Sequence, residues 1–186
     1  MRIIAGRNRG LSLASVGKGD KGAHLRPTTD RVRESLFNLI LNGPYGDPVT
    51  GARVLDLFAG TGALGLEALS RGAAQVTFVE NGAKAAALIR ENVAKCRAGS
   101  ETRLIRRDAT RLGAHDGAPF DLVFLDPPYG KGLGERALVA ALAGGWIARG
   151  ALILWEEGAA VTPPEGLRLL DSRRYGDTRI AILARD

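Results

Sequence analysis

The sequence predicts an α/β protein built on a seven-stranded, mainly parallel sheet with helices on both faces and an antiparallel last strand. Three observations lead to this prediction. Short apolar runs alternate with segments in which apolar residues recur at helical spacing. A glycine-rich turn joins the first apolar run to the first of these helical segments. The last two runs flank Tyr175-Gly176-Asp177, which is typical of a hairpin turn.

The expected strands are short apolar runs, rich in strand-forming residues, between turn signals. In chain order they are Arg53–Phe58, Gln75–Val79, Arg103–Arg106, Leu122–Leu125, Ala151–Trp155, Leu167–Arg174 and Thr178–Ala184. Helical spacing predicts the intervening helices at Ala63–Ser70, Lys84–Lys95 and Gly134–Leu142. We therefore expect residues 49–186 to form one domain.

Residues 1–48 are expected to form a small extension of this domain. Two strand-like runs, Arg2–Ala5 and Leu11–Ala14, flank a glycine-containing segment, which predicts a β-hairpin with Arg7 and Arg9 at its tip. Such a tip could reach phosphate groups.

A helix is expected to follow the hairpin and run to about residue 41. Thr28 or Thr29 can cap its start, since a hydroxyl can accept from a free backbone N–H of the first turn. Arg31 and Arg33 are expected to lie off its buried stripe. That stripe is predicted to consist of Val32, Leu36, Leu39 and Ile40.

All of the formal net charge of +6 lies in the first 33 residues. They hold eight of the 26 basic residues and two of the 20 acidic ones, so the rest of the chain holds 18 of each. A localised basic segment indicates a polyanionic partner. The predicted RNA contacts in this segment are Arg7, Arg9, Arg26, Arg31 and Arg33.

The composition argues against several classes of protein. No apolar run approaches the ~20 residues that span a membrane, and the first residues lack the apolar core of a signal peptide. Cys96 is the only cysteine, and His24 and His115 are isolated, so neither a disulfide framework nor a metal site is expected. These features predict a cytoplasmic protein that binds no metal. As a separate expectation, the protein acts as a monomer.

A strand that runs into a glycine turn indicates a nucleotide-like cofactor. Gly60 and Gly62 let the backbone approach a ligand closely, and Gly65 completes a spacing that also occurs in NAD-binding proteins. Glu80 ends the next strand, where a carboxylate can hold a ribose diol.

Two acidic residues favour S-adenosylmethionine over NAD as this cofactor. Asp56 lies inside the strand before the glycines, where a carboxylate suits a cationic methionyl group and would lie badly beside a pyrophosphate. Asp108 follows the third strand, where it can flank an adenine.

The fourth expected strand ends at Asp126-Pro127-Pro128-Tyr129, because prolines cannot donate to a sheet. The Asp126 carboxylate and the Pro127 carbonyl are two adjacent acceptors that suit the two hydrogens of an exocyclic amine. Tyr129 offers a flat face on which a flipped base can stack. The motif therefore predicts an enzyme that methylates an amino group.

Together these segments resemble the RsmD family, the bacterial 16S rRNA guanine-N2 methyltransferases, which are Rossmann-like class I enzymes dependent on S-adenosylmethionine. The matching stretches run from the hairpin through residues 25–37 and 56–68 to residues 126–129. The resemblance implies that Asp126, Pro127, Pro128 and Tyr129 bind the target base, and that 16S rRNA, within a small-subunit particle, is the partner. The cofactor contacts it implies are Thr28, Asp56, Phe58, Ala59, Gly60, Thr61, Gly62, Glu80, Asn81, Asp108 and Ala109.

Other functions are open from the residues alone. The same amine chemistry could act on adenine-N6 or cytosine-N4 of DNA or RNA, or on a glutamine of a protein. A non-catalytic RNA-binding module and an NAD-dependent oxidoreductase are the alternatives from other classes. The basic amino-terminal segment favours a nucleic acid over a protein substrate.

Overall fold

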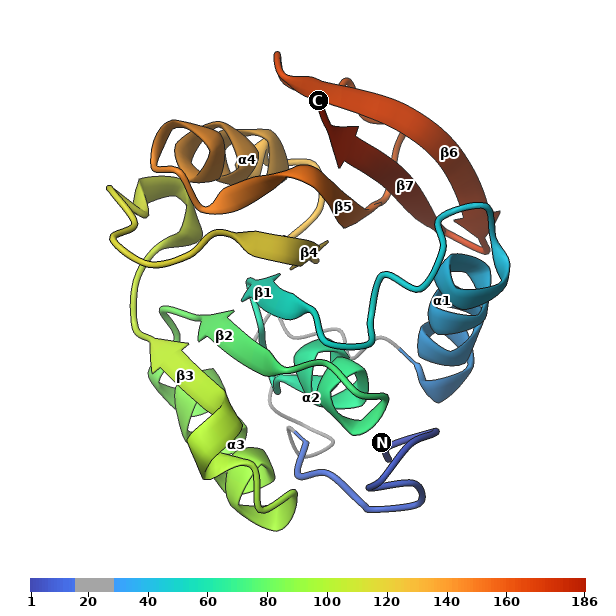
Figure 1. Cartoon of the computed structure of the whole chain (residues 1–186), viewed down its shortest axis with the longest axis vertical. Coiled ribbons are helices and arrows are strands. Elements are labelled where there is room, and N and C mark those ends of the chain that lie inside the picture. The colour runs from blue at the N-terminus through green and yellow to red at the C-terminus, as the bar shows by residue number, and fades with distance from the viewer. Residues whose placement is uncertain (16–28) are drawn as a thin grey trace.

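The computed structural model describes residues 1–15 and 29–186, and a seven-stranded sheet forms its centre (Figure 1). Its strand order is β3-β2-β1-β4-β5-β7-β6. The first five of these strands run parallel, and β7 is antiparallel to both of its neighbours. The strands are β1 (Arg53–Leu57), β2 (Gln75–Val79), β3 (Thr102–Ile105), β4 (Phe120–Leu125), β5 (Ile147–Glu157), β6 (Leu167–Tyr175) and β7 (Thr178–Arg185). The predicted mainly parallel sheet with an antiparallel last strand is confirmed.

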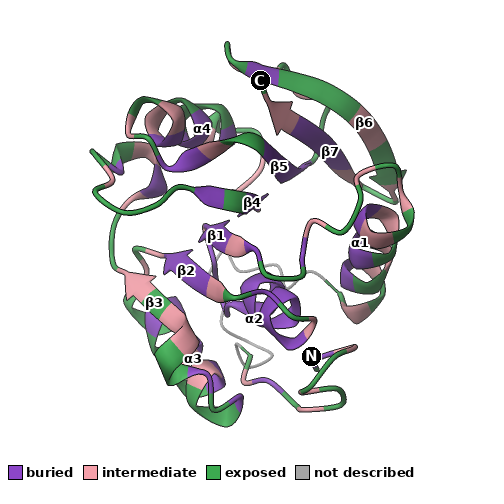
Figure 2. Ribbon diagram, in the orientation of Figure 1, coloured by how far each residue is buried: buried purple, intermediate pink, exposed green. Residues whose placement is uncertain are grey.

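Helices cover both faces of the sheet, because side chains alternate along each strand and both faces carry apolar residues. Val54 of β1 packs with the helices α1, α2 and α3, and its neighbour Leu55 packs with α4 on the other face. Every residue of α2 is buried (Figure 2). The helices are α1 (Asp30–Asn42), α2 (Ala63–Ser70), α3 (Ala83–Lys95) and α4 (Leu133–Ala143), with short 3-10 turns η1 (Gly99–Glu101) and η2 (Ala109–Arg111).

The amino-terminal segment forms a turn with the hydrogen bonds of a small hairpin. The N–H of Ile3 donates to the carbonyl of Leu11 at 2.9 Å, and the N–H of Leu13 donates to the carbonyl of Met1 at 3.0 Å. Arg2 and Ser12 form an antiparallel bridge. The hairpin connection is therefore present, but it is shorter than the two strands expected from the sequence.

The helix α1 begins one residue after its cap. The Thr29 hydroxyl accepts from the N–H of Val32 at 3.3 Å, while Thr28 lies outside the described residues. The prediction that Arg33 lies off the buried stripe is wrong, since Arg33 is fully buried. Its guanidinium pairs with Asp30, the first residue of α1, at 2.9 Å and with the buried Glu67 of α2 at 3.7 Å, while Val32 still packs partly buried against the core.

A buried carboxylate joins the amino-terminal segment to the domain. Glu67 of α2 is fully buried and accepts from the backbone N–H groups of Ile4 at 2.8 Å and Ala5 at 3.0 Å. It also pairs with Arg71 at 2.7 Å and with Arg33 at 3.7 Å. A network of charged residues thus joins residues 1–48 to the domain expected at residues 49–186. Across the part of the chain that the structure describes, no helix combines the length and apolar character of a membrane span.

Candidate active site

The turn after β1 brings backbone close to where a ligand can bind. Phe58 has a φ of 57°, which an aromatic residue rarely adopts and which costs about 1–3 kcal/mol. Gly62 follows with a φ of 76°. Such strain persists only where the surrounding structure imposes it, and it concentrates at functional sites. The predicted glycine turn is therefore a strained element at the carboxyl edge of the sheet.

Glu80 spans this turn from the end of β2. One of its carboxylate oxygens accepts from the N–H of Gly60 at 2.9 Å, and the other accepts from the N–H of Gly82 at 2.7 Å. These two bonds fix the carboxylate beside the glycines. Since a carboxylate has about four acceptor positions, Glu80 can still accept from two ribose hydroxyls. Asn81 is exposed, and its carbonyl accepts from Arg106 at 3.2 Å.

Asp56 lies beneath the turn, only 2% exposed, and accepts from the N–H of Gly65 at 3.0 Å. That bond caps the start of α2, whose first N–H groups lack partners within the helix. Burial raises the pKa of Asp56 to about 8; the Gly65 bond opposes this rise, and the charge of Glu80 adds to it. A Cβ at position 65 would lie 2.5 Å from the Phe78 ring, so glycine is required there.

Asp108 and Ala109 follow β3, next along the same edge. The Asp108 carboxylate accepts from the backbone N–H of Thr110 at 2.9 Å and from its hydroxyl at 2.8 Å. These bonds lower the pKa of Asp108, so it remains ionised. Ala109 is buried in the 3-10 turn that follows. Asp108 thus caps a turn at the position predicted for an adenine contact.

The Asp126-Pro127-Pro128-Tyr129 turn lies next to the glycine turn. Leu57, the last residue of β1, is paired with Leu125, the last residue of β4. Asp126 and Phe58 therefore follow neighbouring strands, although they are far apart in the sequence. Pro127 is buried and Pro128 is partly buried. The fold brings together the two motifs that the sequence predicts to hold the cofactor and the amine.

Tyr129 is anchored by residues that sequence reasoning missed. Its hydroxyl donates to Glu156 at 2.6 Å and lies 3.1 Å from the Thr178 hydroxyl. Burial, followed by the bond to Glu156, raises the pKa of Tyr129 well above its usual value. Glu157 accepts from the N–H of Gly130 at 3.1 Å. The sequence did hold a signal for Glu156 and Glu157, because both lie at the end of a strand, as Glu80 does.

The predicted RNA contacts differ in their surroundings. Arg9 and Arg31 are exposed, whereas Arg7 forms a bidentate ion pair with Glu101, with N–O distances of 2.7 and 2.8 Å. Arg33 is buried against two carboxylates, so its predicted contact with RNA does not agree with the structure. Arg26 lies outside the described residues.

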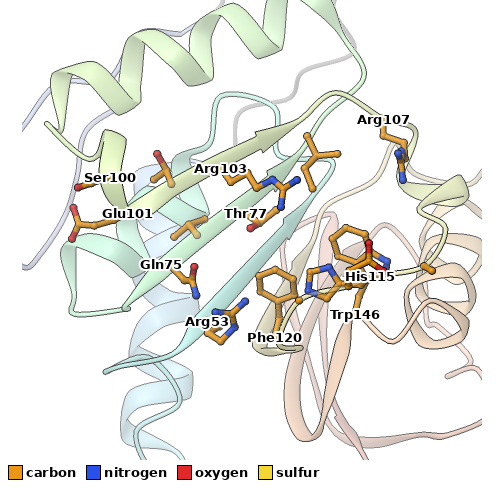
Figure 3. Close-up of a pocket in the computed structure, with 16 residues that line it drawn as sticks. Arg53, Gln75, Thr77, Ser100, Glu101, Arg103, Arg107, His115, Phe120 and Trp146 are labelled. Carbon is orange, nitrogen blue, oxygen red and sulfur yellow. The ribbon is translucent and has the colours of Figure 1, made fainter.

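A cavity of about 480 Å³ lies elsewhere, mainly at the amino ends of the strands (Figure 3). Arg53, Thr77 and Arg103 line one side of it, and His115 stacks on Trp146 with ring centres 4.3 Å apart. None of the predicted cofactor or amine contacts lines this cavity.

Comparisons with known proteins identify relatives that match most of this chain. The family model described as Conserved hypothetical protein 95 matches residues 1–184. Ribosomal RNA small subunit methyltransferase D of Escherichia coli is 41% identical over 84% of this chain and 74% of its own length. The protein of the same name from Haemophilus influenzae is 36% identical over 95% of this chain and 89% of its own length.

A solved structure of a related protein has the same fold as this chain. The yhhF protein of Escherichia coli is 38% identical and superposes with a TM-score of 0.84, covering 100% of this chain and 98% of that one. The Rossmann-like class I methyltransferase fold expected from the sequence is confirmed. Because the family model spans nearly the whole chain, the protein belongs to the Conserved hypothetical protein 95 family, and the resemblance to the RsmD family is confirmed.

Proposed function

We propose that this protein transfers a methyl group from S-adenosylmethionine to the exocyclic N2 amine of a guanine in 16S rRNA. The observation that carries the proposal is the pairing of β1 with β4, which sets the glycine turn beside Asp126. The relatives named as ribosomal RNA small subunit methyltransferases support the substrate class. The substrate would be an assembled small-subunit particle in the cytoplasm, and the enzyme would act as a monomer.

The residues present fit this cofactor. Glu80 is held by two backbone N–H groups, so its remaining acceptor positions would bind a ribose diol, and Asp56 lies beneath the turn, where a cation would favour its ionised form. Asn81, Asp108 and Ala109 line the continuation of the same edge. S-adenosylmethionine would supply a methyl group on a positively charged sulfur.

The chain's own part in the reaction is to hold the amine. The Asp126 carboxylate and the Pro127 carbonyl would accept its two hydrogens and turn the nitrogen lone pair out of the ring plane. As the nitrogen gains positive charge, the carboxylate of Asp126 stabilises it. Tyr129, fixed through its hydroxyl, would present its ring to the base. Most of the rate gain would come from this positioning.

The test uses tritiated S-adenosylmethionine and small ribosomal subunits from a strain that lacks the enzyme. After digestion of the RNA, we expect the label in N2-methylguanosine. Label in an adenine or cytosine derivative would show that guanine is not the substrate base. A particle without label would show that the protein does not methylate this RNA. RNA stripped of its proteins should be labelled less well; equal labelling would refute the particle as substrate.

The Asp126→Ala variant connects this activity to the site. It should lose labelling by at least about a hundredfold, because its amine acceptor is gone, and should bind S-adenosylmethionine as the parent does in calorimetry. Asp116→Ala, in an exposed loop, is the matched control and should label normally. Loss of cofactor binding in Asp126→Ala would contradict the assignment.

A further inference from the structure

We propose that Glu156 determines which base the site accepts, by receiving a hydrogen bond from the N1–H of guanine. This inference rests on the proposed function and adds the residue that separates guanine from adenine and cytosine. Glu156 is not part of the Asp-Pro-Pro-Tyr motif, and it lies 30 positions after Asp126 in the chain.

Strand pairing brings Glu156 to the amine-binding turn. Leu125 of β4 is paired with Trp155 of β5, so the residues that follow them, Asp126 and Glu156, are neighbours at the carboxyl edge. Glu156 is also paired with Ile180 of β7, which packs in the core beneath α1 and α2. Paired residues share a face of the sheet, so the Glu156 side chain lies on the face that carries α2 and the glycine turn.

Contacts around Tyr129 support the same placement. Its hydroxyl donates to Glu156 at 2.6 Å, and the charges of both Glu156 and Asp126 raise the pKa of this phenol. The Glu156 carboxylate therefore lies at the phenolic oxygen, on the edge of the sheet where Asp126 follows the paired strand β4. Glu156 is 7% exposed, so few water molecules compete with a base for it. A carboxylate can accept about four hydrogen bonds, so it can serve Tyr129 and a base together.

The chemistry of the bases then gives the specificity. Guanine carries a ring N1–H directly beside its exocyclic amine. Adenine and cytosine carry a ring nitrogen lone pair at the equivalent position beside theirs. An ionised carboxylate can only accept, so it bonds to guanine and repels the lone pair of the other two bases. A site built to pair one polar group rejects analogues that lack it by factors as large as roughly 10⁴.

The test replaces the target guanine with 2-aminopurine, which keeps the 2-amine but has a lone pair at N1. Wild type should prefer guanine by at least roughly a hundredfold in kcat/KM. The amide of Glu156→Gln can donate to that lone pair. In this variant the ratio of kcat/KM for guanine to kcat/KM for 2-aminopurine should therefore fall at least about tenfold. The fluorescence of 2-aminopurine, which rises when the base leaves the stack, gives a binding measurement without methyl transfer. By this measure Glu156→Gln should bind the modified particle more tightly than wild type.

Tyr129→Phe is the matched control, because it removes the bond to Glu156 but keeps the carboxylate. It should slow the methylation of both substrates and leave the ratio of their kcat/KM values unchanged. Equal losses on both substrates in Glu156→Gln would show that Glu156 only positions Tyr129, and would overturn the proposal. Equal use of the two bases by wild type would also overturn it, without any variant. Failure of wild type to methylate guanine would instead overturn the proposed function.

Discussion

Asp56 shows how one buried residue links stability to pH. An aspartate in an unfolded chain has a pKa of about 4, whereas burial raises the pKa of Asp56 to about 8 in the folded protein. Between these values the folded chain binds a proton that the unfolded chain does not. Stability must therefore fall as the pH rises through this window. A cationic ligand close to Asp56 would favour the ionised form and offset part of this loss.

Replacing Asp56 with Asn should remove this dependence. In the wild type, Asp56 contributes a loss of up to about 1.4 kcal/mol in the free energy of unfolding for each pH unit. Urea unfolding of the cofactor-free protein at several pH values between about 5 and 8 measures it. Asp116→Asn, with its carboxyl group exposed, should keep the wild-type slope. The same slope in Asp56→Asn and wild type would show that Asp56 does not titrate in this range.

At the scale of elements, Glu67 holds three parts of the fold together. The fully buried carboxylate on α2 binds the backbone of Ile4 and Ala5, and it pairs with Arg33 of α1. Arg71, one helical turn further on, pairs with it as well. A charge buried without partners is costly, so all these groups depend on one another. The amino-terminal segment that carries Arg7 and Arg9 is therefore fixed to the domain through α2.

Glu67→Ala should destabilise the protein by about 3–5 kcal/mol, because it removes the buried carboxylate that pairs with Arg71 and Arg33 and accepts from two backbone N–H groups. Glu91→Ala is the matched control on α3. Its side chain is 53% exposed and pairs with Lys95 at 3.0 Å, so its loss should cost less than about 1 kcal/mol. Chemical denaturation measures both variants. Equal effects would mean that the buried network adds nothing beyond a surface ion pair.

At the scale of the whole molecule, the charge is concentrated at one end of the chain. The first 33 residues carry the entire formal excess of +6, but not every arginine there is available to a polyanion. Arg33 is buried and Arg7 is paired with Glu101, whereas Arg9 and Arg31 are exposed. Binding to RNA should therefore weaken with salt through the exposed residues of this segment.

The affinity for the small ribosomal subunit should fall steeply as salt rises. Arg9→Ala should reduce the slope of log affinity against log salt by about one, because one phosphate contact is lost. Arg149→Ala, an exposed arginine at the start of β5, should leave the slope unchanged. Filter binding at four salt concentrations is sufficient. An identical slope for Arg9→Ala and wild type would show that Arg9, at the tip of the hairpin, does not contact RNA phosphates.

The sequence alone determined the order of strands and helices and the two motifs of the site. These features are local: alternation and helical spacing report which faces are apolar, and glycines and prolines mark the turns. The rule that ligands bind at the carboxyl ends of parallel strands was enough to group Asp56, Glu80, Asp108 and Asp126. The seven-stranded sheet described for residues 1–15 and 29–186 agrees with that reading.

Only the tertiary structure decided which charged residues are buried and with which partners. Arg33 was expected on the surface, yet it is buried, because Asp30 and Glu67 offer it ion pairs. Glu156 reaches Tyr129 because β4 and β5 pair in one particular register. Such pairing depends on packing between distant segments, and a charged residue gives no periodic signal of its partner. The environment of each charge therefore follows from the fold, while the fold follows from the apolar pattern.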